Sequence, residues 1–520
     1  MANADMNINN HNDSLSSLLS DKQKDYIFCL SVFFLYCTIY GLISFRLGYV
    51  MEEVHEGVTV HHELYIANMR WGVALWRSIL GFGALPLVAG LVAGAAISLS
   101  LLLHVRIFNI NSYKKRLAYG CIYLCGIQWL YQLMYSNQSD VVALGFLLSS
   151  GSVYLMIKNR GWVSGLIASL LVALSAACYQ SMLLYIFVLW GGYYIMLILN
   201  GSIMSAKNVF RALLVALAGT VLWFVVGRVL MCSPLVSSPI LESIVQYQGD
   251  FVKWSRLDGL PPELQVRCLA RYMFTVPFSN MLGLSHQGQW IYAASLVPVA
   301  LIVYSVWKRG TKKLAFIVGG MLLFLLYVPF LIGVVFVCKM PDRVNIAEPL
   351  AAACVWALLI CRTKCWHPHM VKCFIAFLSV AVLSAIYAVG AYARTEAYNY
   401  ERATMELISM HSRGMEVART AGLKNFNIII VGEPSFAESA ESLFYMNADS
   451  LYPESVHPHI FRGGRSWLPS YIRYLRLNYM RVENVADRER YGEVIKEMPT
   501  WPALGSVEEY DGNIIVKVGP

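Results

Sequence analysis

The stretch with the clearest capacity for chemistry is Glu52-Glu53-Val54-His55-Glu56, which holds three carboxylates and one imidazole. Adjacent carboxylates repel each other and lose solvation near a membrane surface, so one of the pair holds its proton more tightly. A carboxylate in that state is a candidate general base or metal ligand. We therefore take Glu52, Glu53 and Glu56 as candidate catalytic carboxylates and His55 as a candidate sugar or acceptor contact. The competing interpretation is a hydrated, charged loop.

Arginines suited to binding a phosphate form a second group. The planar guanidinium binds phosphate in a bidentate manner, and a cation stabilises the negative charge that develops on a departing phosphate. We rank Arg343 first, because Asp342, Asn345 and Glu348 accompany it in the sequence; Arg271 is second and Arg228 third. The alternative for each is a side chain that extends to lipid head groups.

Two further residues are candidate sugar or acceptor contacts. Glu348 lies in an apolar stretch, where an ionisable group is costly, so we expect it to face a polar cavity. His286 lies in a Gly-rich and Gln-rich loop and could contact sugar or phosphate, although a single loop histidine often does neither.

Composition indicates what must position these residues. Of the 520 residues, 57% are hydrophobic and 14% are charged, against about 25% charged in an ordinary soluble domain. The mean hydropathy is +0.53. The sequence therefore predicts a polytopic membrane protein, in which helices satisfy the backbone within the lipid. We place eleven spans at residues 26–46, 83–104, 117–136, 140–157, 162–178, 181–199, 212–231, 289–307, 314–338, 344–361 and 373–392.

The distribution of basic residues predicts the orientation. Alternate connections between the predicted spans carry 15 basic residues and no acidic one, namely Arg106, Lys114, Lys115, Arg116, Lys158, Arg160, Lys207, Arg211, Lys308, Arg309, Lys312, Lys313, Arg362, Lys364 and Lys372. Basic loops stay in the cytosol, so we expect a cytosolic N-terminus and an outer C-terminus. The net charge of +9 then reports topology, and a nucleic-acid partner is disfavoured.

The predicted spans divide the chain into three parts. Residues 1–25 read as a disordered cytosolic tail. Residues 26–392 form the membrane body, with large outer loops at 47–82 and 232–288. Residues 393–520 contain strand-like runs at 427–432 and 513–518 and helical patterns at 398–421 and 484–497, which predict a small α/β domain on the outer side. Most of the cysteines lie in spans or at their inner ends, so no disulfide framework is implied.

An amphipathic helix is predicted between the acidic cluster and the second span. Over residues 66–80, an apolar side is marked by Trp71, Leu75, Trp76, Ile79 and Leu80. Arg70 and Arg77 are seven residues apart and therefore share one face. This pattern is typical of a helix lying in the membrane interface, where Trp is common. The order is thus a span, an acidic cluster, an interfacial helix and a span.

That order resembles the GT-C class of membrane glycosyltransferases and, more narrowly, the bacterial and phage serotype-converting (Gtr) O-antigen glucosyltransferases. The resemblance implies an all-α GT-C-like body, an acidic residue at the reaction centre just after the first span, and a second acidic or polar position before the fourth span. Asp140, in Asn137-Gln-Ser-Asp140, takes that second position. Arg70, in Met69-Arg70-Trp71, stands where relatives show a Gly-Arg-Trp-like stretch, and both are candidate sugar or acceptor contacts.

The resemblance implies transfer of a hexose, with glucose as first choice, from undecaprenyl phosphate to the O-antigen of lipopolysaccharide. The reaction would take place at the periplasmic face of the bacterial inner membrane by a single inverting displacement, with Glu52 or Glu53 as base. No cofactor is required, and a divalent metal is the less favoured option. An O-antigen polymerase or ligase would not need acids directly after the first span. A lipid-linked sugar transporter would show repeated halves, which are absent from the sequence.

Overall fold

The computed structural model describes residues 20–45, 62–80, 86–126, 128–133, 138–158, 161–202, 205–236, 261–275, 290–332, 344–362, 368–432, 472–473 and 475–518. The chain forms two compact units, whose described residues are 20–389 and 390–518. The first is a helical bundle and the second contains a small sheet. Each unit is described by itself.

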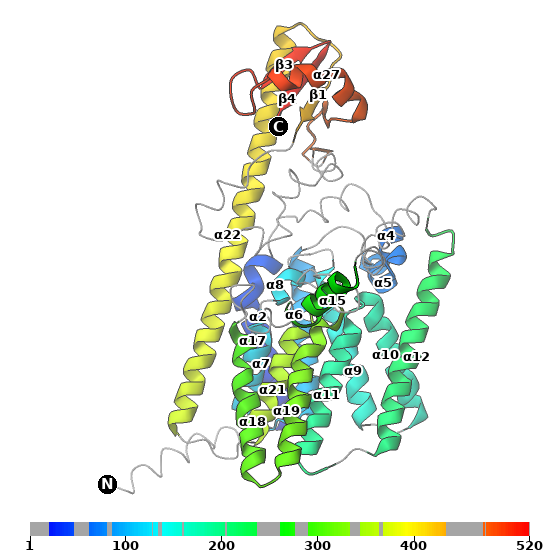
Figure 1. Ribbon diagram of the computed structural model, residues 1–520, viewed down its shortest axis with the longest axis vertical. Coiled ribbons are helices and arrows are strands. Elements are labelled where there is room, and N and C mark those ends of the chain that lie inside the picture. The colour runs from blue at the N-terminus through cyan, green and yellow to red at the C-terminus, as the bar shows by residue number, and fades with distance from the viewer. Residues whose placement is uncertain are drawn as a thin grey trace. The chain divides into compact units, whose positions relative to one another are not determined.

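The first unit consists of helices, of which the long ones run side by side as a bundle (Figure 1). Their bounds are α2 Asp21–Ser44, α4 His62–Ala67, α5 Trp71–Leu80, α6 Pro86–Ile107, α7 Tyr113–Leu124, α8 Gln128–Leu133, α9 Ser139–Lys158, α10 Trp162–Cys178, α11 Met182–Leu199, α12 Ala206–Met231, α15 Pro262–Ala270, η1 Arg271–Thr275, α17 Trp290–Ala294, α18 Leu296–Lys308, α19 Lys312–Tyr327, η2 Val328–Phe330, α21 Glu348–Arg362 and α22 Pro368–Thr420. α22 has 53 residues and continues into the second unit.

In the described part of the chain, eight helical segments are long and apolar enough to cross a membrane, and α10 is a shorter apolar helix. The multi-pass membrane body is therefore confirmed, whereas the predicted count of eleven spans is not. Predicted span 117–136 is divided between α7 and α8, and predicted span 344–361 corresponds to α21, which has only 15 residues. α21 is buried from Glu348 to Ile360, so it packs against protein along almost its whole length.

Close packing explains the break between α7 and α8. The Tyr40 hydroxyl donates hydrogen bonds to the carbonyl oxygens of Leu124 and Gly126, at 2.6 and 3.0 Å. A Cβ at Gly126 would lie 2.5 Å from Cβ of Pro349, which is far closer than side chains approach. Gly126 therefore lets the chain pass directly over the start of α21.

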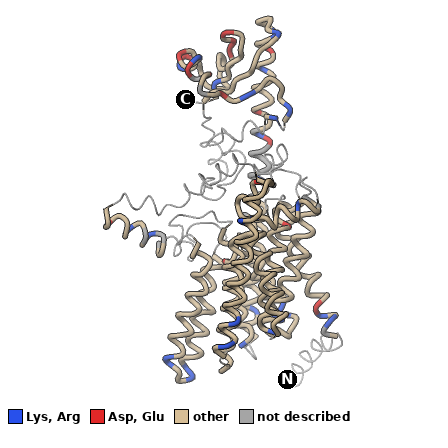
Figure 2. Tube along the Cα trace, turned by 90° about the vertical axis from the view of Figure 1, so that its right-hand side faces the viewer, with Lys and Arg blue, Asp and Glu red and all other residues tan. Residues whose placement is uncertain are grey.

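One end of the bundle is strongly basic, and we call it the basic end (Figure 2). Asp25, near the start of α2, pairs there with Arg106 of α6 at 2.6 Å and with Arg116 of α7 at 2.7 Å. α9 ends at this end with Lys158, so its first residues, including Asp140, lie at the opposite end of the bundle. The two ends of the bundle are thus chemically distinct.

The second unit contains a four-stranded sheet in the order β2-β1-β4-β3, formed by β1 Ile428–Val431, β2 Met480–Val482, β3 Val507–Tyr510 and β4 Asn513–Lys517. β1 pairs in parallel with β2 and β4, with Ile428 opposite Ile514. β3 pairs antiparallel with β4. The predicted strands at 427–432 and 513–518 are confirmed as adjacent central strands, and the predicted helix at 484–497 is α27 Val485–Glu497.

Both faces of this sheet are covered. Ile429, Val431 and Ile515 pack with Tyr491 of α27 on one face. On the other face, Ile428 lies against Gly414 of α22. Central strands that are buried on both faces read as continuous apolar runs, which is why β1 and β4 were recognisable in the sequence.

A capping interaction fixes the start of α27. The side chain of Asn484 accepts a hydrogen bond from the backbone of Asp487, and the Asp487 carboxylate accepts one from the backbone of Asn484. Arg481 of β2 also donates to Asp487, at 2.8 Å. The Arg481 guanidinium holds the pKa of the Asp487 carboxyl below its usual value. This carboxylate therefore joins β2 to α27.

Candidate active site

The end of the bundle opposite the basic end is shaped by a turn between two short helices. Residues 66–80 were predicted as one helix, but the structure has α4 and α5, separated by Asn68–Arg70. Met69 adopts a φ of 61° in this turn, a conformation that is uncommon for a residue with a side chain. The Arg70 backbone N–H donates to the Tyr65 carbonyl at 2.7 Å, which closes the turn. Arg70 therefore precedes α5 instead of lying on it.

Trp223 of α12 holds this turn in place. Its indole N–H donates to the Met69 carbonyl at 3.0 Å, and the Trp71 indole N–H donates to the Trp223 carbonyl at 3.3 Å. Sparsely populated backbone conformations persist when the surrounding structure fixes them, and they cluster at functional sites. The turn that presents Arg70 is such a position.

A buried ion pair joins α5 to α9. Arg77 Nη2 lies 2.5 Å from Asp140 Oδ1, and the side chains are 7% and 1% exposed. The same oxygen accepts the Val141 backbone N–H at 2.9 Å, and Oδ2 accepts the Trp76 indole N–H at 2.9 Å. Both carboxylate oxygens of Asp140 are thus bound by protein donors.

The orientation of α5 differs from that of an ordinary surface helix. Its apolar residues Leu75 and Ile79 are 52% and 67% exposed, whereas Arg77 is buried. A helix whose apolar residues face outward and whose arginine faces the bundle fits a membrane-facing position. The polar side of α5 is therefore used for contacts within the protein.

Arg70 lies against the turn between α10 and α11. Its guanidinium carbon is 4.4 Å from the centre of the Tyr179 ring, a cation–π distance. Its nitrogens donate to the side-chain oxygens of Gln138 at 3.3 Å and Gln180 at 3.4 Å. Gln180 in turn donates to the Asn68 carbonyl at 2.5 Å. The Arg70 side chain therefore connects the α4–α5 turn to the residues just before Asp140.

The Tyr179 hydroxyl and Nε2 of Gln128 are buried polar atoms at this end that have no hydrogen-bond partner among the described residues. Buried polar groups are nearly always paired with protein, water or ligand, so these two atoms mark positions where a polar ligand or water would be stabilised. Tyr179 directly adjoins Arg70, which makes it the stronger candidate.

Gly72 allows α5 to approach α10 closely. A Cβ at Gly72 would lie 2.9 Å from the Ala177 carbonyl carbon and 3.0 Å from the Cys178 nitrogen, both backbone atoms that cannot rotate away. The absence of a side chain at residue 72 thus sets the position of α5 and, through it, of Arg77.

We expect Gly72→Ala to lower the free energy of unfolding by about 1–3 kcal/mol, the usual range for overpacking. The measurement is the thermal unfolding midpoint of the purified full-length protein. Gly320→Ala is the matched control, because a Cβ at Gly320 of α19 meets no atom within 4 Å; in a helix, Ala there should be neutral or stabilising. Equal midpoints for the two variants would contradict the close packing of α5 on α10.

The structure locates only some of the residues predicted from the sequence. Arg70 and Asp140 lie at the same end of the bundle. Arg70 contacts Gln138, two residues before Asp140, and Arg77 pairs with Asp140. Glu348 is 1% exposed at the start of α21, and the polar cavity expected beside it stays a prediction. The predicted residues that lie outside the described residues are Glu52, Glu53, His55, Glu56, His286 and Arg343.

The remaining predicted arginines lie on exposed surfaces. Arg228 of α12 is exposed, and its guanidinium is 5.5 Å from the Phe224 ring of the same helix. Arg271 is exposed at the start of η1. This segment is linked to α19, because the Tyr327 hydroxyl donates to the Met273 carbonyl at 2.7 Å.

Several site residues were not predicted from the sequence as site residues. These are Trp76, Arg77, Gln138, Tyr179 and Gln180. The predicted shared face of Arg70 and Arg77 on one helix is wrong, because Arg70 lies in the turn before α5. Both side chains nevertheless contact the 138–140 segment. Their partners lie next to the start of α9 and in the turn between α10 and α11. These contacts depend on tertiary packing, for which a single sequence carries no signal.

Comparison with known families gives a match that covers this region. The family model described as "Glucosyl transferase GtrII" matches residues 58–360, which is more than half of the chain. The match contains α4 to α21 almost completely and begins just after Glu56. No curated protein and no solved structure matches the chain.

Proposed function

The chain belongs to the GtrII glucosyl transferase family, and from this premise we propose that it transfers glucose from undecaprenyl phosphate to O-antigen repeat units of lipopolysaccharide. A glucosyltransferase with several membrane-spanning helices fits a lipid-linked donor, because such a donor is reached from within the bilayer. The single observation that carries the proposal is the family match over residues 58–360, since this range contains the whole Arg70–Asp140 region.

In this proposal Arg77, Trp76 and Asp140 are positioning residues. The Asp140 carboxylate is enclosed by protein donors, so it supports the site by holding α5 against α9. The resemblance implies a direct sugar or acceptor contact for Asp140, whereas the role proposed here is to position the residues that make such contacts. A buried pair of this kind is costly to form and is best explained by the precise geometry it enforces.

Arg70 and Tyr179 form the proposed sugar or acceptor contact. Arg70 is half-buried and held by two glutamines, so its guanidinium is fixed before any ligand binds. The Tyr179 hydroxyl is buried and lacks a described partner. A polyhydroxylated sugar offers both donors and acceptors, and it would satisfy that hydroxyl while also accepting from the guanidinium.

The proposed reaction is a single displacement with inversion. Glu52 or Glu53, or in third place Glu56, takes the proton from the acceptor hydroxyl as the acceptor oxygen bonds to the anomeric carbon. The bond from that carbon to the phosphate oxygen breaks, and undecaprenyl phosphate departs with the electron pair. Arg343, Arg271 and Arg228 remain the proposed donor-phosphate ligands, in that order. His55, His286 and Glu348 remain proposed sugar or acceptor contacts.

The basic end supports a proposed orientation. Lys and Arg gather at that end of the bundle (Figure 2), and the positive-inside rule would place it in the cytosol. Arg70 and Asp140, at the opposite end, would then face the periplasm. This arrangement fits an enzyme of the bacterial inner membrane that acts on lipopolysaccharide precursors after export. No cofactor is required by the proposed displacement.

The proposal is tested by expressing the gene in a strain that makes the acceptor O-antigen and supplies the lipid-linked glucose. Mass spectrometry of the lipopolysaccharide is expected to show one additional hexose per repeat unit. The matched control is the same strain without the gene. A change in the number of repeats with unchanged repeat mass would contradict the proposal and point to a polymerase.

A further inference from the structure

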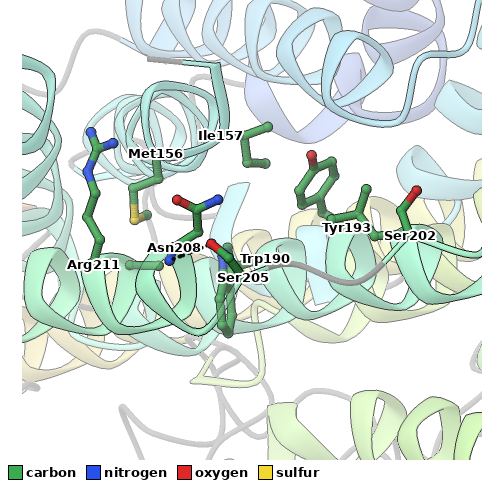
Figure 3. Close-up of a pocket in the computed structure, with 10 residues that line it drawn as sticks. Met156, Ile157, Trp190, Tyr193, Ser202, Ser205, Asn208 and Arg211 are labelled. Carbon is green, nitrogen blue, oxygen red and sulfur yellow. Dashed lines mark hydrogen bonds between the residues drawn. The ribbon is translucent and has the colours of Figure 1, made fainter. Parts of the chain in front are cut away.

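A cavity at the basic end of the bundle is separate from the candidate active site. Its volume is about 350 Å³, and it lies between the end of α9, one side of α11 and the start of α12 (Figure 3). Its position is fixed by Met156 of α9, two residues before Lys158, and by Arg211 in the first turns of α12. A volume of this size is within the usual range for small-ligand sites.

The lining of the cavity has a polar and an apolar part. Arg211, Asn208 and Ser205 supply a cation, an amide and a hydroxyl, whereas Met156 and Trp190 supply apolar surface. None of the described lining residues is acidic. A cation with neutral hydrogen-bond donors and no carboxylate selects an anion that has several acceptor oxygens, and phosphate is the most common of these.

The Arg211 guanidinium is held at the cavity wall. Its Nη2 donates to the Gly161 carbonyl and to the Ser164 hydroxyl, both at 3.0 Å. These bonds join the start of α12 to the start of α10 and restrict the side chain before a ligand binds. Figure 3 shows Asn208, Ser205 and Trp190 near the middle of the lining, with Arg211 to one side of them and Tyr193 to the other. A fixed guanidinium loses little entropy on binding an anion.

The surroundings of the cavity favour a lipid over a soluble anion. α11 and α12 are both among the helices long and apolar enough to cross a membrane. α12 exposes Phe210, Leu213 and Leu217, at 63%, 48% and 61% exposure. Trp190 stacks on Tyr194 with ring centres 6.0 Å apart, and such aromatic residues are common at the level of lipid head groups. Lys158, two residues after the lining residue Met156, adds positive charge nearby.

We propose that this cavity binds the phosphodiester head group of an anionic membrane glycerophospholipid. Arg211 and Asn208 contact the phosphate oxygens, and the acyl chains extend along the apolar surface of α12. Basic pockets between membrane helices are suited to such head groups. Lipid binding at this cavity requires only that the basic end meets a membrane surface, and it is independent of the glucosyl transfer proposed above.

The experiment uses the full-length protein in nanodiscs of phosphatidylcholine that contain a trace of phosphatidylglycerol with a photoactivatable head group. Covalently labelled peptides are identified by mass spectrometry. We expect labelling on α9, α11 and the start of α12. Labelling should fall about tenfold in Arg211→Gln, the loss expected for one charge-assisted contact. The matched control, Lys207→Gln, changes an exposed neighbour outside the cavity lining and should label like the wild type.

A second variant separates ligand binding from folding. Asn208→Leu keeps the backbone cap, in which the Asn208 N–H donates to the Ser205 hydroxyl, but removes the polar side chain. We expect it to lose labelling several-fold with an unchanged thermal midpoint. Unlabelled phosphatidylglycerol should compete, and inorganic phosphate should not. Labelling of Arg211→Gln and Asn208→Leu at the wild-type level would overturn the proposal. Competition by inorganic phosphate would also overturn it and indicate a site for a soluble anion.

Discussion

Asp140→Asn is expected to lower the free energy of unfolding of the bundle by about 3–5 kcal/mol, because it removes the carboxylate that the buried Arg77 guanidinium contacts. The pair is 7% and 1% exposed, so water cannot replace the lost partner. Glucosyl transfer should also fall at least about 100-fold, since a small displacement of α5 disturbs the geometry of the site. The measurements are thermal unfolding of the purified protein and the rate of transfer.

The matched control is Arg106→Gln in the same bundle. Arg106 is 45% exposed, and its partner Asp25 keeps a second contact with Arg116. A change of about 0–1 kcal/mol is expected for such an exposed pair. The double variant Arg77→Gln with Asp140→Asn should be less damaging than the sum of the single changes, as coupled residues require. Wild-type stability and activity of Asp140→Asn would show that the pair does not position α5.

Removing the catalytic base is the second change with a large expected effect. Glu52→Gln and Glu53→Gln keep the size of each side chain but prevent proton transfer. At least one of them should reduce transfer by about 10²–10⁴-fold, the usual contribution of general base catalysis. The amount of protein in the membrane should be unchanged. The measurement is the hexose content of the O-antigen repeat, with an immunoblot of the membrane fraction.

Glu63→Gln provides the matched control for these two variants. Glu63 is a nearby acid on α4 that has no assigned catalytic role, and it is only half-buried. We expect its substitution to leave transfer close to the wild-type level. Full activity in Glu52→Gln, in Glu53→Gln and in the double variant would remove these residues from the reaction. Glu56 would then be the remaining candidate in the cluster.

Apolar patterns predicted the membrane body well, because lipid-facing and protein-facing helices are both hydrophobic. The same patterns predicted single spans at residues 117–136 and 344–361, where the structure has the α7–α8 pair and the 15-residue α21. Hydropathy alone does not show that α21 is buried from Glu348 to Ile360, because that burial depends on packing against other helices. The break at Gly126 depends on its contact with Pro349, which is more than 200 residues away in the chain.

In the small sheet, too, apolar patterns predict only some of the elements. β1 and β4 are continuous apolar runs and were predicted. β3 carries exposed Glu508 and Glu509, and β2 has only three residues with Arg481 in the middle. Edge strands have one partner and need little apolar surface, so their sequences resemble loops.

The candidate site was predictable in part. The resemblance indicated Asp140, whereas the shared helical face predicted for Arg70 and Arg77 is wrong, because Arg70 precedes α5. Their pairing depends on the approach of Gly72 to Ala177 and on the anchoring of the Met69 turn by Trp223. These are contacts between distant segments, and a single sequence does not encode them in any local pattern.

The central claim is tested most directly by reconstituting the purified protein in liposomes with undecaprenyl phosphate glucose and lipopolysaccharide that carries the acceptor O-antigen. We predict that glucose is transferred to the repeat unit from this donor, that a nucleotide-linked glucose does not replace it, and that the anomeric configuration is inverted in the product. Transfer from the nucleotide sugar alone, or a product that retains the configuration of the donor, would contradict the claim.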